Sequence, residues 1–179
     1  MKNSKSRSTF SRFAPIAAAT LLAFGAASAE AATTTGILTV QAQVAKNCLV
    51  SSPTLNFGTY NPGGGAVSQS ATISVRCTKN TGFTVALNGG QAANINARKM
   101  KSTSTPAETL DYQLFTNAGL TTVFGDGTTG STAPGTGLGM AALNAINVTV
   151  YGQLPDSAAN QGAAVLTDYT DSVTITVTY

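Results

Sequence analysis

The chain has 179 residues, of which 9% are charged, and it contains no His and no Trp. Without His, the sequence excludes Ser–His–Asp triads and His-based metal sites. Ten Lys and Arg against seven Asp and Glu give a formal net charge of +3. Four of the basic residues lie within the first twelve positions, so six basic and seven acidic residues remain beyond them. The remainder therefore carries no basic excess of the kind that indicates nucleic-acid binding.

The first 29 residues have the pattern of a secretory signal peptide. Lys and Arg are scattered over residues 1–12, an apolar run covers Phe13 to Ala27, and Ala27-Ser28-Ala29 has the form of a cleavage site. A membrane anchor or a basic tail remains the alternative, although the run is short for a membrane span. The sequence thus predicts export, and it leaves a single domain of ordinary size.

The next alternating stretch is Ile37 to Val44. Apolar Leu38, Val40, Ala42 and Val44 alternate with Thr39, Gln41 and Gln43. Such a period of two predicts a strand with one buried face. It is either the first strand of its own domain or a strand that pairs elsewhere.

Two cysteines, Cys48 and Cys77, are present. In an exported protein they predict a disulfide. The bridge would close a loop of about 30 residues and stabilise the fold by roughly 3–4 kcal/mol on the chain-entropy estimate. A thiol nucleophile is the alternative, but no His is available as its base.

Short strands are expected through the middle of the chain. Leu55 to Phe57 should form one strand, closed by turn residues at 61–65. Ala71 to Cys77 and Phe83 to Leu87 alternate and are separated by a spacing typical of hairpins. Further strands are predicted at residues 48–50, 110–114, 121–124 and 146–150.

Three stretches between these strands are predicted to be loops. They cover residues 91–109, 125–139 and 152–167, which are polar or rich in Gly, Thr and Ser. In the first loop, Arg98, Lys99 and Lys101 are expected to be solvated. No long amphipathic helix is expected, so the fold class is an all-β sandwich.

The last stretch, Asp171 to Tyr179, alternates most strictly. Its Ser and Thr residues are expected to face outward, and the opposite face carries Val173, Ile175, Val177 and Tyr179. No later strand follows in the sequence. Beside an empty position in a sheet, this strand would present unpaired backbone groups.

No set of residues points to catalysis. The acids are scattered, and Asp168 with Asp171 is too sparse for an acid pair or a Ca²⁺ loop. Gly63-Gly64-Gly65 lacks the Lys and the helix of a phosphate loop. We therefore expect no enzyme activity, no metal and no cofactor.

Taken together, several motifs resemble the spore coat protein U domain family, which includes the pilins of archaic chaperone–usher pili and the major pilins of Csu-type pili. The resemblance covers residues 30–179. It departs from the family at residues 162–167, where a Gly-x-Tyr element is often found. The motifs are Cys48 after the alternating segment, Phe57-Gly58-Thr59-Tyr60-Asn61-Pro62, Cys77, Tyr151-Gly152-Gln153-Leu154-Pro155, and the closing run Tyr169 to Tyr179.

The resemblance implies an immunoglobulin-like sandwich that lacks its final strand. Residues 1–29 would be the signal peptide, residues 30–45 an extension that donates a strand, and residues 46–179 the pilin domain. Leu38, Val40, Ala42 and Val44 would enter a groove in another subunit, beside the strand carrying Val173, Ile175, Val177 and Tyr179.

The family also implies partners and a location. A periplasmic chaperone would fill the groove first, an outer-membrane usher would catalyse exchange, and neighbouring subunits would form a cell-surface fimbrium for attachment and biofilm formation. The rival is a self-complete exported sandwich that binds a ligand or carbohydrate, or a spore-coat-type protein.

Overall fold

The computed structural model describes residues 30–179, so the predicted signal peptide lies outside the described residues. The chain divides into two units, residues 1–41 and 42–179. In the first, residues 30–41 form no helix or strand, and their side chains are exposed. The second unit holds all the strands and is called the domain below.

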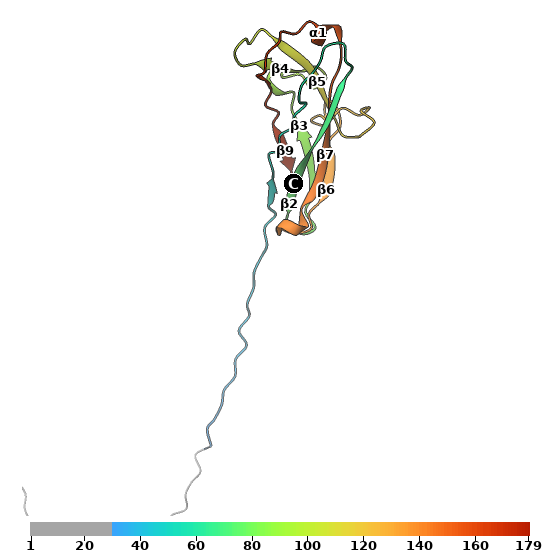
Figure 1. The fold of residues 1–179 in the computed structure, drawn as a ribbon. Helices are drawn as coiled ribbons and strands as arrows, with labels where there is room; N and C mark the ends of the chain where they lie inside the picture. The colour runs from blue at the N-terminus through green and yellow to red at the C-terminus, as the bar shows by residue number, and fades with distance from the viewer. Residues whose placement is uncertain (1–29) are drawn as a thin grey trace, which may run out of the picture. The chain divides into compact units, whose positions relative to one another are not determined.

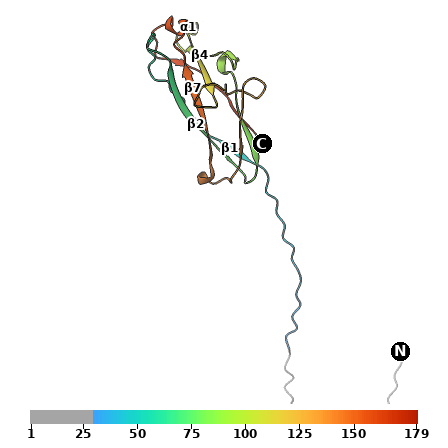
Figure 2. The same cartoon turned by 90° about the vertical axis from the view of Figure 1, so that its right-hand side faces the viewer.

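The larger sheet of the domain has six strands in the order β1-β2-β7-β5-β4-β8, and each strand is antiparallel to its neighbours. Figure 2 shows β2 and β7 side by side along the domain. The strands are β1 (Cys48–Val50), β2 (Val67–Cys77), β4 (Arg98–Ser102), β5 (Thr109–Phe115), β7 (Ile146–Leu154) and β8 (Tyr169–Thr170).

The smaller sheet has three strands in the order β6-β3-β9, also antiparallel (Figure 1). They are β6 (Ala133–Thr136), β3 (Gly82–Leu87) and β9 (Ile175–Thr178). Three single-turn helices complete the domain: η1 (Gly90–Ala92), η2 (Ala142–Asn144) and α1 (Ala158–Gln161). The all-β prediction is therefore confirmed.

The described residues contain no helix with the length and apolar character needed to cross a membrane.

The core lies where the inward faces of the two sheets meet. Alternate residues of β2 and β3 are buried as the period of two predicts, because successive side chains of a strand point to opposite faces. The most buried of these are Ile73, Val75, Cys77, Phe83, Val85 and Leu87. Cys48 and Cys77 form the predicted disulfide.

The predicted hairpin between β2 and β3 is wrong. The two strands belong to different sheets, and the chain changes sheet over residues 78–81. A turn there is held by Thr81 N–H donating to the Thr78 carbonyl at 3.1 Å and by contact of the two hydroxyls at 2.7 Å. A four-residue connection fits a hairpin or a corner equally well, and only the tertiary partners decide between them.

The closing stretch also changes sheet, which one continuous strand would not do. β8 pairs with β4 in the larger sheet, and β9 pairs with β3 in the smaller one. Residues 171–174 connect them without strand structure. At this connection the Asp171 carboxylate accepts hydrogen bonds from Gln91 N–H and Ser172 N–H.

Two of the predicted loops contain strands. Residues 91–109 include β4, and residues 125–139 include β6. The predicted return strand at residues 121–124 makes only isolated bridges, at Val123 and Phe124. The loop expected from Gly152 begins later, because β7 continues to Leu154.

Arg98 is the largest departure from prediction. Its side chain was expected in solvent but is 0% exposed. Its guanidinium donates to the carbonyls of Asn88, Ile95 and Phe124 and to Gln113 Oε1. Burial lowers the pKa of Arg98 from its ordinary value, and the carbonyl dipoles help to stabilise the charge.

Candidate docking groove

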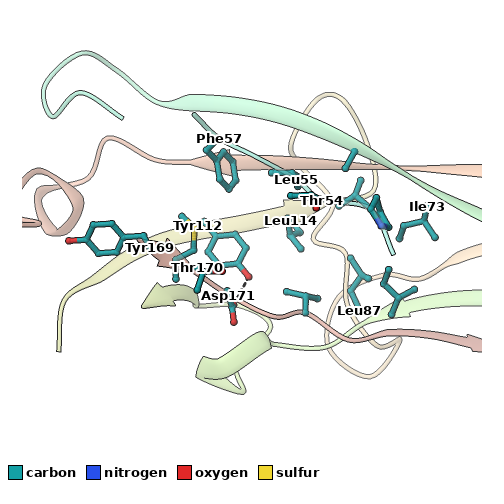
Figure 3. A pocket seen from close by; sticks show the side chains of 16 residues that line it. Thr54, Leu55, Phe57, Ile73, Leu87, Tyr112, Leu114, Tyr169, Thr170 and Asp171 are labelled. Atoms are coloured by element: carbon teal, nitrogen blue, oxygen red, sulfur yellow. Dashed lines mark hydrogen bonds between the residues drawn. The ribbon is translucent and has the colours of Figure 1, made fainter. Parts of the chain in front are cut away.

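An apolar groove of about 360 Å³ runs between the larger sheet and the start of β9. Figure 3 shows Leu55 and Phe57 on one side of it and Thr170, Asp171 and Leu87 on the other, with Tyr112 and Leu114 between them. Met100 and Tyr169 line one part of the groove, and Ile73, Val173 and Ile175 line another. The groove is thus a gap in the core that is open to solvent.

One wall of the groove is the extended segment 52–60, called the first wall below. The predicted strand at Leu55 to Phe57 is wrong, because these residues pair with no strand. Within the described part of the chain, their backbone amides have no hydrogen-bond partner. The first wall is held instead by side chains: a Cβ added at Gly152 would lie 2.9 Å from both Leu55 and Phe57. Glycine at this position lets the two side chains lie directly on β7.

The first wall is anchored at both ends. At its start, Ser51 N–H donates to the Ser74 carbonyl at 2.9 Å, and Ser74 N–H donates to Ser51 Oγ at 2.8 Å. At its end, the Tyr60 hydroxyl donates to the Asp156 carboxylate. The same carboxylate accepts the N–H groups of Gly63 and Gly65, each at 3.0 Å.

The contacts at the end of the first wall shift the pKa values of Tyr60 and Asp156. The hydrogen bond from Tyr60, together with the two glycine amides, lowers the pKa of Asp156 to about 2. Desolvation and the adjacent carboxylate raise the pKa of Tyr60 to about 12. The anchor therefore stays intact across the physiological pH range.

The opposite wall is β9, which has a neighbour on one side only. Asn88 N–H donates to the Thr174 carbonyl at 3.2 Å, whereas Leu87 N–H turns away from β9 to Gly125 at 2.9 Å. Since hydrogen-bonded pairs alternate along antiparallel strands, the backbone groups of Ile175 and Val177 face away from β3. Their side chains pack against the core, as does that of Val173. Burial alternates along this stretch as far as Val177, whereas Tyr179, expected on the same face, is 51% exposed.

One part of the groove is polar. The Tyr112 hydroxyl donates to Asp171 Oδ2 at 2.6 Å, and Gln91 N–H donates to Oδ1 at 2.8 Å. Burial and this carboxylate raise the pKa of Tyr112 well above its usual range. Neither this cluster nor the buried Arg98 beside it was predicted, because neither has a local signal in the sequence.

Asp168 and Asp171 do not form an acid pair. The Asp168 carboxylate accepts hydrogen bonds from the hydroxyls of Ser102 and Thr103 and from Ser104 N–H, and these lower its pKa. Asp171 binds other partners in the groove. Among residues 30–179, no three His, Cys, Asp or Glu side chains lie together in a way that would hold a metal ion.

The predicted donor residues belong to no strand. Leu38 and Val40 are 86% and 82% exposed in the first unit. Ala42 and Val44 lie at the beginning of the domain, are also exposed, and have no ladder partner. The donor role of these residues stays a prediction.

Comparisons with known proteins agree with this architecture. The sequence profile described as Spore Coat Protein U domain matches residues 34–176. No curated protein sequence matches the chain.

Among solved structures, the chain is similar to the chaperone–tip adhesion subunit pre-assembly complex CsuC–CsuE from archaic chaperone–usher Csu pili of Acinetobacter baumannii. Identity is 21% and the TM-score 0.53, over 76% of this chain and 40% of that chain. A complex described as the chaperone–tip adhesin of CFA/I fimbriae biogenesis gives 12% identity and a TM-score of 0.43, over 74% and 41%. This chain thus spans less than half the length of either. The first likeness shows a pilus-subunit fold of the immunoglobulin type.

Proposed function

The chain belongs to the spore coat protein U domain family, and from that premise we propose that it is a structural subunit of a surface fibre that polymerises by strand donation. Residues 37–44 of one subunit occupy the groove of the next. The extension is residues 30–45, the acceptor domain is residues 46–179, and residues 1–29 direct export through the periplasm.

The observation that carries the proposal is the groove with two unpaired walls. The first wall has no ladder partner, and β9 has one on a single side only. An extended segment between them could bond to both backbones and cover the apolar floor. This is β-strand addition, in which main-chain hydrogen bonds give affinity and side-chain pockets give specificity.

The segment 37–44 has properties that suit this groove. Eight residues extend about 26 Å at 3.3 Å each. Its apolar face carries Leu38, Val40 and Val44, whose burial would contribute roughly 1.5–3 kcal/mol each, and Ala42, which contributes less. Its other face carries Ile37 and the uncharged polar residues Thr39, Gln41 and Gln43. Because donor and acceptor surfaces differ, the contact is head to tail and produces an open filament.

The open groove also indicates which partners a subunit would need. A free subunit would expose apolar surface and strand edges, which favour aggregation. We therefore expect a periplasmic chaperone to lend a strand before assembly, and an outer-membrane usher to exchange it for the next subunit. The CsuC–CsuE complex, a chaperone with a pilus subunit, supports the first of these partners. The fibre would serve surface attachment and biofilm formation, with no enzymatic step.

Deletion of residues 37–44 tests the proposal. The full chain, released from a co-expressed chaperone, should form a ladder of non-covalent oligomers on electrophoresis without heating. The deletion should remove the ladder while chaperone capture persists. A matched control replaces Thr39, Gln41 and Gln43 with Ser, which keeps the apolar face, and should polymerise.

Two results would contradict the proposal: a deleted chain that polymerises like the full one, or a full chain that remains a stable monomer without a chaperone. The second would favour a self-complete sandwich that binds a small ligand, for which a groove of this volume is large enough.

A further inference from the structure

Three basic and three acidic side chains lie at opposite ends of the domain. Lys46, Arg76 and Lys79 gather at the end with the disulfide, called the basic end below. Asn47 N–H donates to Thr78 Oγ1 at 3.2 Å, and Thr78 N–H donates back to the Asn47 carbonyl at 2.9 Å. These bonds place Lys46 and Lys79 next to each other, and Arg76 precedes Cys77 on β2. None of the three forms an ion pair with a described residue.

The other end of the domain carries Glu108, Asp156 and Asp168, and is called the acidic end. Glu108 precedes β5, Asp156 follows β7, and Asp168 precedes β8. The hydrogen-bond donors to these carboxylates are hydroxyl and N–H groups, which leave their charges uncompensated. Lys101 is the nearby cation without an ion pair, since Lys99 pairs with Asp111.

The two ends lie far apart. β2 has 11 residues and runs from Val67, which is paired with Leu154 near the acidic end, to Cys77 at the basic end. Eleven residues of strand span roughly 35 Å. Figure 1 shows α1, β4 and β5 gathered at one end of the domain. Charges this far apart in one molecule are screened from each other by salt.

The spacer between the donor segment and the basic end is short. Val44 is the last donor residue, and Asn47 is already bonded to Thr78. Three Cα steps join them, which limits the distance to about 11 Å. The basic end of a donor subunit must therefore lie close to the point where its segment leaves the groove of the acceptor.

The direction of the inserted segment determines whether Val44 leaves the groove at the acidic end or at the basic end of the acceptor. The closing stretch runs from Asp171, near the acidic end, to Thr178 in β9, which pairs with Thr84 near the basic end. A segment antiparallel to β9 brings Val44 out beside Asp171 and the acidic end. A parallel segment would bring it out at Thr178, where the acceptor also carries Lys46 and Lys79. Every ladder between the described strands is antiparallel, and like charges disfavour the other choice.

We infer that the basic end of each subunit docks on the acidic end of the next, so that Lys46, Arg76 and Lys79 face Glu108, Asp156 and Asp168 across the joint. This interface rests on the proposed strand donation. It adds a charge-complementary surface that steers approach and selects the head-to-tail order.

Polymer growth from chaperone-bound subunits tests the interface. Lys46→Gln/Lys79→Gln removes two positive charges at the basic end. Its matched control, Ser70→Glu/Thr72→Glu, changes the net charge equally on the exposed face of β2. At low salt the first variant should grow about 3–10-fold more slowly than the unaltered chain, and its rate should depend less on salt. The control should grow at the unaltered rate. Equal rates for both variants would overturn the interface.

Cross-linking separates this inference from strand donation itself. Lys46→Cys is combined with Thr167→Cys beside the acidic end, or with Thr178→Cys beside the basic end. A bismaleimide of roughly 10 Å, matched to the reach of the spacer, should join neighbouring subunits in the first pair only. Polymers that cross-link through Thr178→Cys would refute the docking and leave strand donation intact. A chain that forms no polymer even without substitution would refute strand donation.

Discussion

The segment 37–44 and the strand β9 have the same sequence pattern and different structures. Both alternate apolar and polar residues, and both have a Thr-rich or Gln-rich outer face. β9 pairs with β3 and packs its inner side chains on the core. Residues 37–44 remain exposed and outside any strand. Alternation thus encodes a capacity for pairing, and the strand forms only where a partner edge is present.

The largest effect should come from breaking the apolar face of the donor segment. Val40→Asp would carry a charge into the groove, so we expect polymer yield to fall roughly 100-fold or more. Gln41→Asp is the control, because its side chain lies on the opposite face and should leave yield nearly unchanged. Yield is measured by the oligomer ladder. Equal fibre yields from Val40→Asp and Gln41→Asp would contradict the assignment of Val40 to the face that enters the groove.

A second test concerns the buried side chain of Arg98, which lies beside the start of β9. Arg98 donates to the carbonyl of Leu87, the last residue of β3, and to that of Asn88, which follows it. Arg98→Met should leave these carbonyls unpaired and lower the free energy of unfolding by about 3–4 kcal/mol. The neighbouring Lys99→Met removes only a partly exposed ion pair and should cost less than about 1 kcal/mol. Denaturant unfolding of the chaperone-free chain measures both. Similar losses in the two variants would contradict the structural role of Arg98.

The smallest effect concerns the first wall and depends on pH. Because the folded-state pKa of Asp156 is lowered to about 2 from 3.8, its stabilisation is complete above about pH 4 and is lost as pH falls towards 2. Asp156→Asn should lower the free energy of unfolding at pH 5 and make it depend less on further acidification, as measured by denaturant unfolding. Asp126→Asn is the control, because its carboxylate binds the N–H groups of Thr128 and Thr129 in another loop. A free energy of unfolding at pH 5 that is unchanged in Asp156→Asn would show that the anchor contributes nothing to stability.

The sequence predicted those strands in which the local alternation of apolar and polar residues agrees with their burial in the fold. Ile73, Val75 and Cys77 alternate because one face of β2 lies on the core, and the disulfide follows from export and two cysteines. β6 was missed because Ala133-Pro134-Gly135-Thr136 has no alternating apolar side chains. Its pairing with β3 depends on tertiary contact alone.

Only one of the two walls of the groove could be predicted from the sequence. Its β9 wall follows from alternation, but the first wall was expected to be a strand. Leu55 and Phe57 are apolar and extended in either case, so their side chains carry no information about missing backbone partners. Arg98 was assigned to solvent because charged residues are usually exposed. Its burial depends on carbonyls from distant parts of the sequence.

The position of the disulfide has a mechanical consequence. Cys48 is the first residue of β1, which is only three residues long, and it is bonded to Cys77 at the end of the longest strand. Tension applied to the extension reaches Cys48 and passes through a covalent bond into β2. A pulled subunit would therefore resist being peeled open from its N-terminal edge, and under reducing conditions the same force would first detach β1.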